Sequence, residues 1–290
     1  MFIDSYHQGY AWSDGITDGI QKVLADTGAE LKIFRMDTKR NGSDDFKKAA
    51  AEKAKAEIES FKPDVVIAAD DNASKFLVAP FYKDAALPFV FCGVNWDATV
   101  YGFPCKNVTG MVEVTPIPQL IDQLKPYAKG TKIGFLAPDL LTAKKEAANY
   151  KTVFGLEVTA YYAKDFEDWK KGFTELQSKV DMLIIDSDGG LYADKAQEMV
   201  SFVEASTKIP TGAAYDFMAS YALITYGKVA SEQGAWAADA AVKILGGTSP
   251  ASIEIAQNQM GQLIVNTRIA QALGVELPFE LLSAAEKVIE

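Results

Sequence analysis

The sequence predicts an α/β protein with two similar lobes, each built around a parallel β-sheet. Short runs of β-branched, aromatic and other apolar residues alternate with segments of helical period, which is typical of βαβ units. At 290 residues the chain is long enough for two such cores. Two stretches also echo each other, since DVVI shortly precedes Asp70 and DMLII directly precedes Asp186. We therefore expect polar loops at equivalent strand ends, where ligands of open α/β sheets bind.

The first half contains four strand signals separated by helix signals. Residues 1–4 read as the last residues of a strand whose beginning is cut away. Strands are expected where Val, Ile, Leu and Phe cluster, at residues 31–35, 64–69, 88–92 and 108–112. Apolar spacing of three and four predicts helices near residues 13–26, 43–60 and 73–84.

The second half repeats this rhythm and then departs from it. Strands are expected at residues 132–136, 156–161, 181–185 and 210–214, with helices near 117–127, 143–153, 166–178 and 192–206. An Ala-rich helix over residues 229–245 then ends at a pair of glycines. Two short strands, 253–256 and 262–266, and two helices, 267–273 and 279–289, complete the chain. A chain that returns to earlier elements in this way crosses between lobes more than once.

Composition excludes several classes of protein. The formal net charge is −10 and no basic patch stands out, so we expect no nucleic-acid partner. No apolar run approaches the roughly 18 residues of a membrane span. The N-terminus has neither the basic nor the apolar region of an export signal, as in a mature form. With one histidine and two cysteines, the chain offers no zinc site, and Cys92 and Cys105 are either a disulfide or two separate thiols.

Motifs for catalysis or nucleotide binding are absent as well. Neither a dinucleotide fingerprint nor a P-loop occurs, and His7 stands in no nucleophile elbow. We therefore expect no cofactor, no metal and no catalytic residue. Aromatic side chains instead crowd the loops that follow predicted strands, namely Tyr6, Tyr10 and Trp12, then Trp96 and Tyr101, then Tyr215 and Phe217. Rings with polar tips suit a site that stacks on an organic ligand, although the same rings could simply pack the loops onto the core.

Polar residues share these loops and could orient a ligand. They are Asp70, Asp71 and Asn72, then Asn95 and Asp97, and finally Asp216. A residue such as Asp71 or Asn72 ahead of a helix could equally serve as its N-cap. Because Asp216 lies between two aromatic residues, the sequence predicts an ammonium pocket there.

Several segments resemble a known family. They are SYHQGYAW at residues 5–12 followed by DGI at 18–20, FCGVNWD at 91–97, NVTG at 107–110, and the tail with NTRIA at 266–270, LGV at 273–275, Pro278 and Leu281-Leu282. From its first residues to its last, the chain resembles the ABC-transporter substrate-binding proteins of the tryptophan/tyrosine-binding type. It is also similar to extracytoplasmic sensor domains of bacterial signalling proteins, and its Tyr10/Trp12 pair and Cys92 look closer to that branch.

The resemblance implies a type I periplasmic-binding fold: two Rossmann-like lobes, three crossings and a ligand cleft between the lobes. The N-terminal lobe would comprise residues 1–112 plus about 230–256, and the C-terminal lobe 113–229 plus about 257–290. Carried over by position, the ligand-binding residues would be Ser5, Tyr10, Trp12, Asp70, Asp71, Asn72, Ala73, Ser74, Asn95, Trp96 and Asp97 on one wall, and Pro138, Asp139, Ser187, Asp188, Gly189, Tyr215 and Asp216 on the other.

The expected function is that of a periplasmic or otherwise extracytoplasmic solute-binding protein, monomeric and without enzymatic activity. It would capture a small organic ligand by lobe closure, an amino acid with an apolar or aromatic side chain, and deliver it to a membrane permease of an ABC transporter. The alternative is a ligand-sensing input domain attached to the transmembrane part of a signalling protein. A cleft enzyme is a more remote reading.

Overall fold

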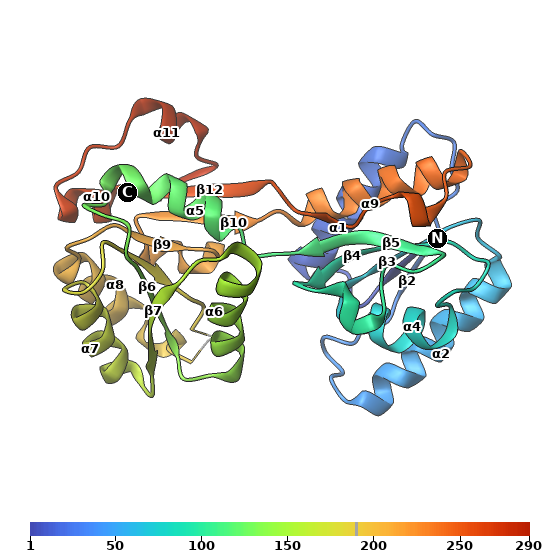
Figure 1. The fold of residues 1–290 in the computed structure, drawn as a ribbon, viewed down its shortest axis with the longest axis horizontal. Helices are drawn as coiled ribbons and strands as arrows, with labels where there is room; N and C mark the ends of the chain where they lie inside the picture. The colour runs from blue at the N-terminus through green and yellow to red at the C-terminus, as the bar shows by residue number, and fades with distance from the viewer. Residues whose placement is uncertain (189–190) are drawn as a thin grey trace. The chain divides into compact units, whose positions relative to one another are not determined.

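The chain folds into two compact units, described here by a computed structural model over residues 1–188 and 191–290 (Figure 1). The first unit comprises Met1–Val114 and Val229–Met260, and the second comprises Thr115–Lys228 and Gly261–Glu290. The chain therefore passes from one unit to the other three times.

The first unit contains a six-stranded parallel sheet in the order β11-β5-β4-β3-β1-β2. Its strands are β1 (Phe2–Asp4), β2 (Ile33–Arg35), β3 (Val66–Ala69), β4 (Phe89–Asn95), β5 (Val108–Glu113) and β11 (Ala256–Gln257). Strands β1, β3 and β5 are buried along their whole length. Helices cover both faces of a parallel sheet, so such strands read as continuous apolar runs rather than as alternating ones.

The helices of the first unit include α1 (Ala11–Leu24), α2 (Asp44–Phe61), α3 (Asp70–Ala73), α4 (Ala79–Phe81) and α9 (Ala230–Leu245). Helix α2 begins at a Ser43 cap, whose hydroxyl accepts the Phe46 amide at 3.3 Å. The helix expected over residues 73–84 is found at residues 70–81, where a π-helical turn at Ser74–Val78 separates α3 from α4. Pro80 has no amide hydrogen to donate, so the regular ladder of helical hydrogen bonds cannot continue through it.

Helix α9 lies side by side with α1, although about 200 residues separate them in sequence (Figure 1). A Cβ on Gly234 would lie 2.0 Å from the Ile16 carbonyl oxygen, and one on Gly19 would lie 2.2 Å from the Ser231 carbonyl oxygen. The two backbones thus approach more closely than any side chain at these positions would allow. Around this contact, Ile20 and Ala237 join one buried core cluster.

Helix α9 also supplies hydrogen bonds at a bulge in the sheet. The register between β4 and β5 shifts between Phe91 and Val94, and Gly93 within this bulge has φ of +68°. The side-chain oxygen of Gln233 accepts the Gly93 amide at 2.9 Å, and its side-chain nitrogen donates to the Val112 carbonyl at 3.3 Å. Gln233 is fully buried, so α9 supplies the hydrogen bonds that the bulge takes away from the strands.

The second unit contains a seven-stranded sheet in the order β13-β12-β10-β9-β8-β6-β7. Its strands are β6 (Ile133–Pro138), β7 (Val158–Ala163), β8 (Met182–Ile185), β9 (Thr211–Ala213), β10 (Ile224–Lys228), β12 (Gly261–Asn266) and β13 (Lys287–Ile289). All neighbours are parallel except β10 and β12. Its helices are α5 (Ile117–Leu124), α6 (Leu141–Phe154), α7 (Phe166–Leu176), α8 (Ala196–Ser206), α10 (Thr267–Leu273) and α11 (Phe279–Ala284).

Two expectations for the last third of the chain differ from the structure. The strand expected at 253–256 is shorter and lies later, as β11, and a 3₁₀ turn at Pro250–Ser252 precedes it. The helix expected at 279–289 ends at Ala284, and its last residues become β13, whose backbone groups pair with β12. Strand β10 was not expected. No helix in the described part of the chain has the length and apolar composition needed to cross a bilayer.

Of the two alternatives for Cys92 and Cys105, the structure has two separate thiols. Cys92 is fully buried in β4 within the core cluster, and burial raises the pKa of its thiol well above the ordinary value. The Cys105 thiol instead contacts the Asn107 side-chain oxygen at 3.5 Å.

The close contact between α1 and α9 predicts that Gly234→Ala destabilises the protein by about 2–3 kcal/mol, because the added methyl group forces the helices apart. Gly42→Ala is the matched control, since no described atom lies within 4 Å of a Cβ there. We expect the control to change the free energy of unfolding in urea by less than about 0.5 kcal/mol. Equal effects of the two substitutions would contradict the assigned contact.

Candidate functional site

In both sheets the strand order reverses at one point. The chain winds outward in opposite directions from β1 and β3 in the first unit, and from β6 and β8 in the second. Connections leave such a pair toward opposite faces, which opens a crevice at the carboxyl ends of the strands. Asp70 directly follows β3 and Asp186 directly follows β8, so each unit places a carboxyl group at its reversal point.

Asp70 is a buried carboxyl group with an incomplete set of partners. Its exposed fraction is 2% and its backbone φ is +69°, a left-handed conformation that Asp tolerates better than most residues. The Trp12 indole N–H donates to its Oδ1 at 3.0 Å, while Oδ2 is buried with no hydrogen-bond partner among the described residues. Burial, followed by the nearby Glu113, raises the pKa of Asp70 well above its ordinary value.

Several predicted binding residues are buried and hold the segment around Asp70 in place. Ser5, Ala73 and Ser74 are fully buried. The Ser5 hydroxyl donates to the Ala69 carbonyl at 2.5 Å and accepts the Ala73 amide at 2.8 Å, which joins β1 to the start of α3. The Asn72 side chain donates to the Thr38 hydroxyl at 2.9 Å. These contacts fix the position of α3, whose first residue is Asp70.

Asp71, Asn95 and Tyr101 form a hydrogen-bonded group above the ends of β3 and β4. Asp71 Oδ2 accepts the Asn95 side-chain amide at 2.7 Å, and its Oδ1 accepts the Tyr101 hydroxyl at 2.8 Å. Asp97 caps the 3₁₀ turn Ala98–Tyr101 by accepting the amide and hydroxyl of Thr99, both at 2.8 Å. Trp96, half-buried with φ of +61°, completes the loop after β4.

An aromatic pair lies in the loop after β1. The rings of Tyr6 and Tyr10 meet edge to face with centroids 5.4 Å apart. The exposed Lys39 ammonium lies 5.1 Å from the Tyr6 centroid and 4.8 Å from that of Tyr10, within the range of a cation–π contact. Burial raises the pKa of Tyr6, with smaller contributions from Asp70 and other acidic neighbours. The sequence predicted aromatic residues in this loop, and the structure brings two of them together.

The second unit has a cavity of about 200 Å³ at its reversal point. It is lined by Leu140, Thr142, Ala143, Glu146, Asp186, Ser187 and Tyr215. Asp186 is 7% exposed, and burial together with the nearby Glu146 raises its pKa to about 7. Neither Asp186 nor Glu146 was among the binding residues predicted from the sequence. The position of Asp186 directly after its strand, like Asp70 after β3, was the available signal.

The other predicted residues of the second unit surround this cavity or lie outside it. Pro138 is buried at the end of β6, and Asp139 is exposed and paired with Lys144. Asp188 is 9% exposed, and Gly189 lies outside the described residues. Asp216 is exposed and accepts the Phe217 amide at 2.8 Å, while the rings of Tyr215 and Phe217 lie 5.5 Å apart. The ammonium pocket at Asp216 therefore stays a prediction.

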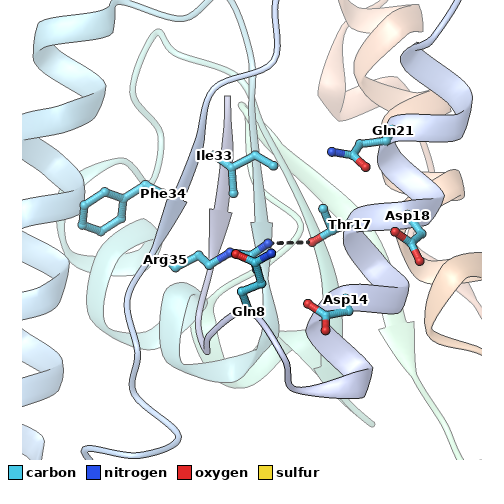
Figure 2. Close-up of a pocket in the computed structure, with 8 residues that line it drawn as sticks. All are labelled: Gln8, Asp14, Thr17, Asp18, Gln21, Ile33, Phe34 and Arg35. Atoms are coloured by element: carbon cyan, nitrogen blue, oxygen red, sulfur yellow. Dashed lines mark hydrogen bonds between the residues drawn. The ribbon is translucent and has the colours of Figure 1, made fainter.

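A cavity of about 750 Å³ lies between α1 and β2 in the first unit (Figure 2). Its polar groups already bind one another: Arg35 forms an ion pair with the buried Asp4 and reaches the Thr17 hydroxyl at 3.5 Å. Asp14 accepts the Gly9 amide at 2.9 Å. Because this cavity also opens beside the edge strand β2 rather than at the reversal point, it is a weaker candidate for the binding site.

Comparison with known proteins shows a family and a fold. A family model described as ABC transporter substrate binding protein matches residues 11–289. The ligand-free, open structure of CD0873, a substrate binding protein with adhesive properties from Clostridium difficile, is 22% identical with a TM-score of 0.77, covering 99% of this chain and 98% of that one. An ABC domain from Streptococcus pneumoniae in complex with L-Trp is 22% identical with a TM-score of 0.58, at the same coverage.

A LacI family transcriptional regulator from Bifidobacterium animalis is 14% identical with a TM-score of 0.54, covering 90% of this chain and 94% of that one. None of the curated proteins matches the chain. The structural matches confirm the expected α/β fold with two parallel-sheet lobes, of the type I periplasmic-binding class.

The burial of Asp70 predicts a specific pH dependence of stability. Because the folded state holds the Asp70 proton above the ordinary carboxyl pKa of about 4, we expect the wild type to lose stability as pH rises above about 4. Asp70→Asn keeps the shape of the neutral carboxyl group and removes this loss. We expect the difference in free energy of unfolding, variant minus wild type, to grow with pH in urea titrations. The exposed Asp26→Asn variant should show no such growth.

Proposed function

Since this chain belongs to the family of ABC transporter substrate binding proteins, we propose that it captures an amino acid with an apolar or aromatic side chain for an ABC permease. Members of the family work outside the cytoplasm and bind a solute without reacting with it, so the chain is not an enzyme. The observation that supports an amino-acid ligand is the pairing, in each unit, of a buried carboxyl group with aromatic rings at the strand-order reversal. The L-Trp bound to the Streptococcus pneumoniae relative agrees with this proposal.

Typical interaction energies indicate that residues of one unit alone would bind the ligand too weakly. A hydrogen bond to a charged group contributes about 1.5–3 kcal/mol, and each stacked ring about 0.5–1.5 kcal/mol. One such bond and two rings reach at most about 6 kcal/mol, whereas micromolar affinity requires about 8 kcal/mol. We therefore propose that one ligand contacts residues of both units.

The contacts we propose are those that the family resemblance places by position. In the first unit they are Tyr10, Trp12, Asp70, Asp71, Asn72, Asn95, Trp96 and Asp97, with Ser5, Ala73 and Ser74 as the supporting layer. In the second they are Asp139, Ser187, Asp188, Gly189, Tyr215 and Asp216, with Pro138 beneath them. A ligand held by both sets stabilises only the state in which both reach it. The population of this closed state is then the signal that the permease recognises.

The first test of this function is a thermal-shift and calorimetric comparison of L-tryptophan, L-tyrosine and L-phenylalanine. We expect at least one to raise the melting temperature at millimolar concentration. Tyr10→Ala should then weaken its binding about two- to tenfold, the loss of one stacking contact. Tyr127→Ala is the matched control, because Tyr127 lies in a 3₁₀ turn after α5, away from the reversal point. No response to any amino acid would contradict the proposed ligand class.

Closure is tested separately by small-angle X-ray scattering. Saturation with the amino acid that binds most tightly should decrease the radius of gyration relative to the ligand-free protein, because the closed state is more compact. Tyr10→Ala should need more ligand to reach the same decrease. Tight binding with an unchanged scattering curve would mean that the protein is a rigid binder.

A further inference from the structure

The cavity in the second unit contains two carboxyl groups from different elements. Asp186 directly follows β8, while Glu146 comes from the second turn of α6. Glu146 accepts a hydrogen bond from the Thr115 hydroxyl and is also bonded to the buried Tyr150 hydroxyl. The protein thus supplies donors to Glu146. Asp186 is nine-tenths buried, lines the cavity wall, and has the amide of Ser187 as its hydrogen-bonding support.

Burial and the neighbouring acid outweigh the one positive charge that faces Asp186. From α6 it faces Glu146, which raises its pKa, and the hydroxyl of Tyr150. From the end of β10 it faces Lys228, which lowers its pKa by less than burial and Glu146 raise it. Lys228 also lies 5.6 Å from the ring of Tyr215, and Tyr162 of β7 is the remaining titratable neighbour. Two acids against one ammonium group favour a neutral, protonated Asp186 in the free protein.

The same arrangement favours a cation that enters the cavity. A volume of about 200 Å³ holds several water molecules, so it has room for a small charged head group. The Tyr215 ring on the cavity wall offers a π-face to a cation. Building on the proposed function, we propose that Asp186 receives the ammonium group of the ligand and releases its own proton to solvent when it does so.

The proton balance makes this inference measurable. The ligand keeps its three ammonium hydrogens, Asp186 changes from carboxylic acid to carboxylate, and up to one proton leaves per ligand bound. Affinity should therefore rise with pH up to about 7, by at most about tenfold per pH unit, and level off above it. An analogue without the amino group cannot displace the Asp186 proton, so its affinity should not rise with pH.

The experiment is isothermal titration calorimetry with the amino acid of the three that binds most tightly, and with its amine-free 3-arylpropionate. Titration at pH 6 in buffers of different ionisation enthalpy counts the protons released by the wild type, with no variant needed. We expect a substantial fraction of one proton for the amino acid and none for the analogue. Asp186→Asn should weaken the amino acid at least tenfold at pH 8 and abolish the proton release.

Matched variants separate this inference from its competitors. Asp122→Asn removes an exposed carboxylate on α5 of the same unit and should change neither quantity. If Asp216→Asn abolishes proton release while Asp186→Asn does not, the ammonium group lies at Asp216 and the inference is wrong. Tight binding without proton release in the wild type overturns it as well. If no amino acid binds at all, the proposed function fails first, which is a distinct outcome.

Discussion

The contact between α1 and α9 is the constraint on which the first unit depends. Two glycines let the helices meet backbone to backbone, and this brings Gln233 into the sheet at the bulge of β4. The bulge in turn places Gly93 against Asp70, where a Cβ would lie 2.7 Å from the carboxyl oxygen. The position of the buried acid is therefore determined by a helix that enters the sequence more than a hundred residues later.

The two units resemble each other most at the reversal points of their sheets. Each has an acid directly after the strand beside the reversal, and burial raises the pKa of both. Their surroundings differ, because Asp70 is bonded to an indole N–H while Asp186 opens onto a cavity with a second carboxyl group. The two units thus present two chemically distinct acidic groups at equivalent strand ends.

Local patterns predicted most elements because apolar periodicity is a local property. Helices α1, α2, α7 and α9 and strands β4, β5, β6 and β8 lie within a few residues of their expected positions. Strand β13 was mistaken for helix because its pairing with β12 depends on tertiary contacts. The π-helical turn was not predicted because it lies several residues before Pro80, the residue that interrupts the helical hydrogen bonds.

The site was harder to predict than the fold, for a physical reason. Residues that follow strands could be named, but sequence alone does not say which of them are buried. Ser5 and Ser74 are buried. Glu146 lines the cavity from helix α6, and helical periodicity alone does not show that this face of the helix lies near the strand ends.

The return of α9 also determines when the protein can fold. The core of the first unit includes Ala237, Ala238 and Ile244, and the sheet of the second unit needs β12 and β13. Neither unit can close its core on a partial chain that ends before these segments. Contacts of such long sequence separation slow folding, so we expect both cores to close only once the last segments of the chain are available.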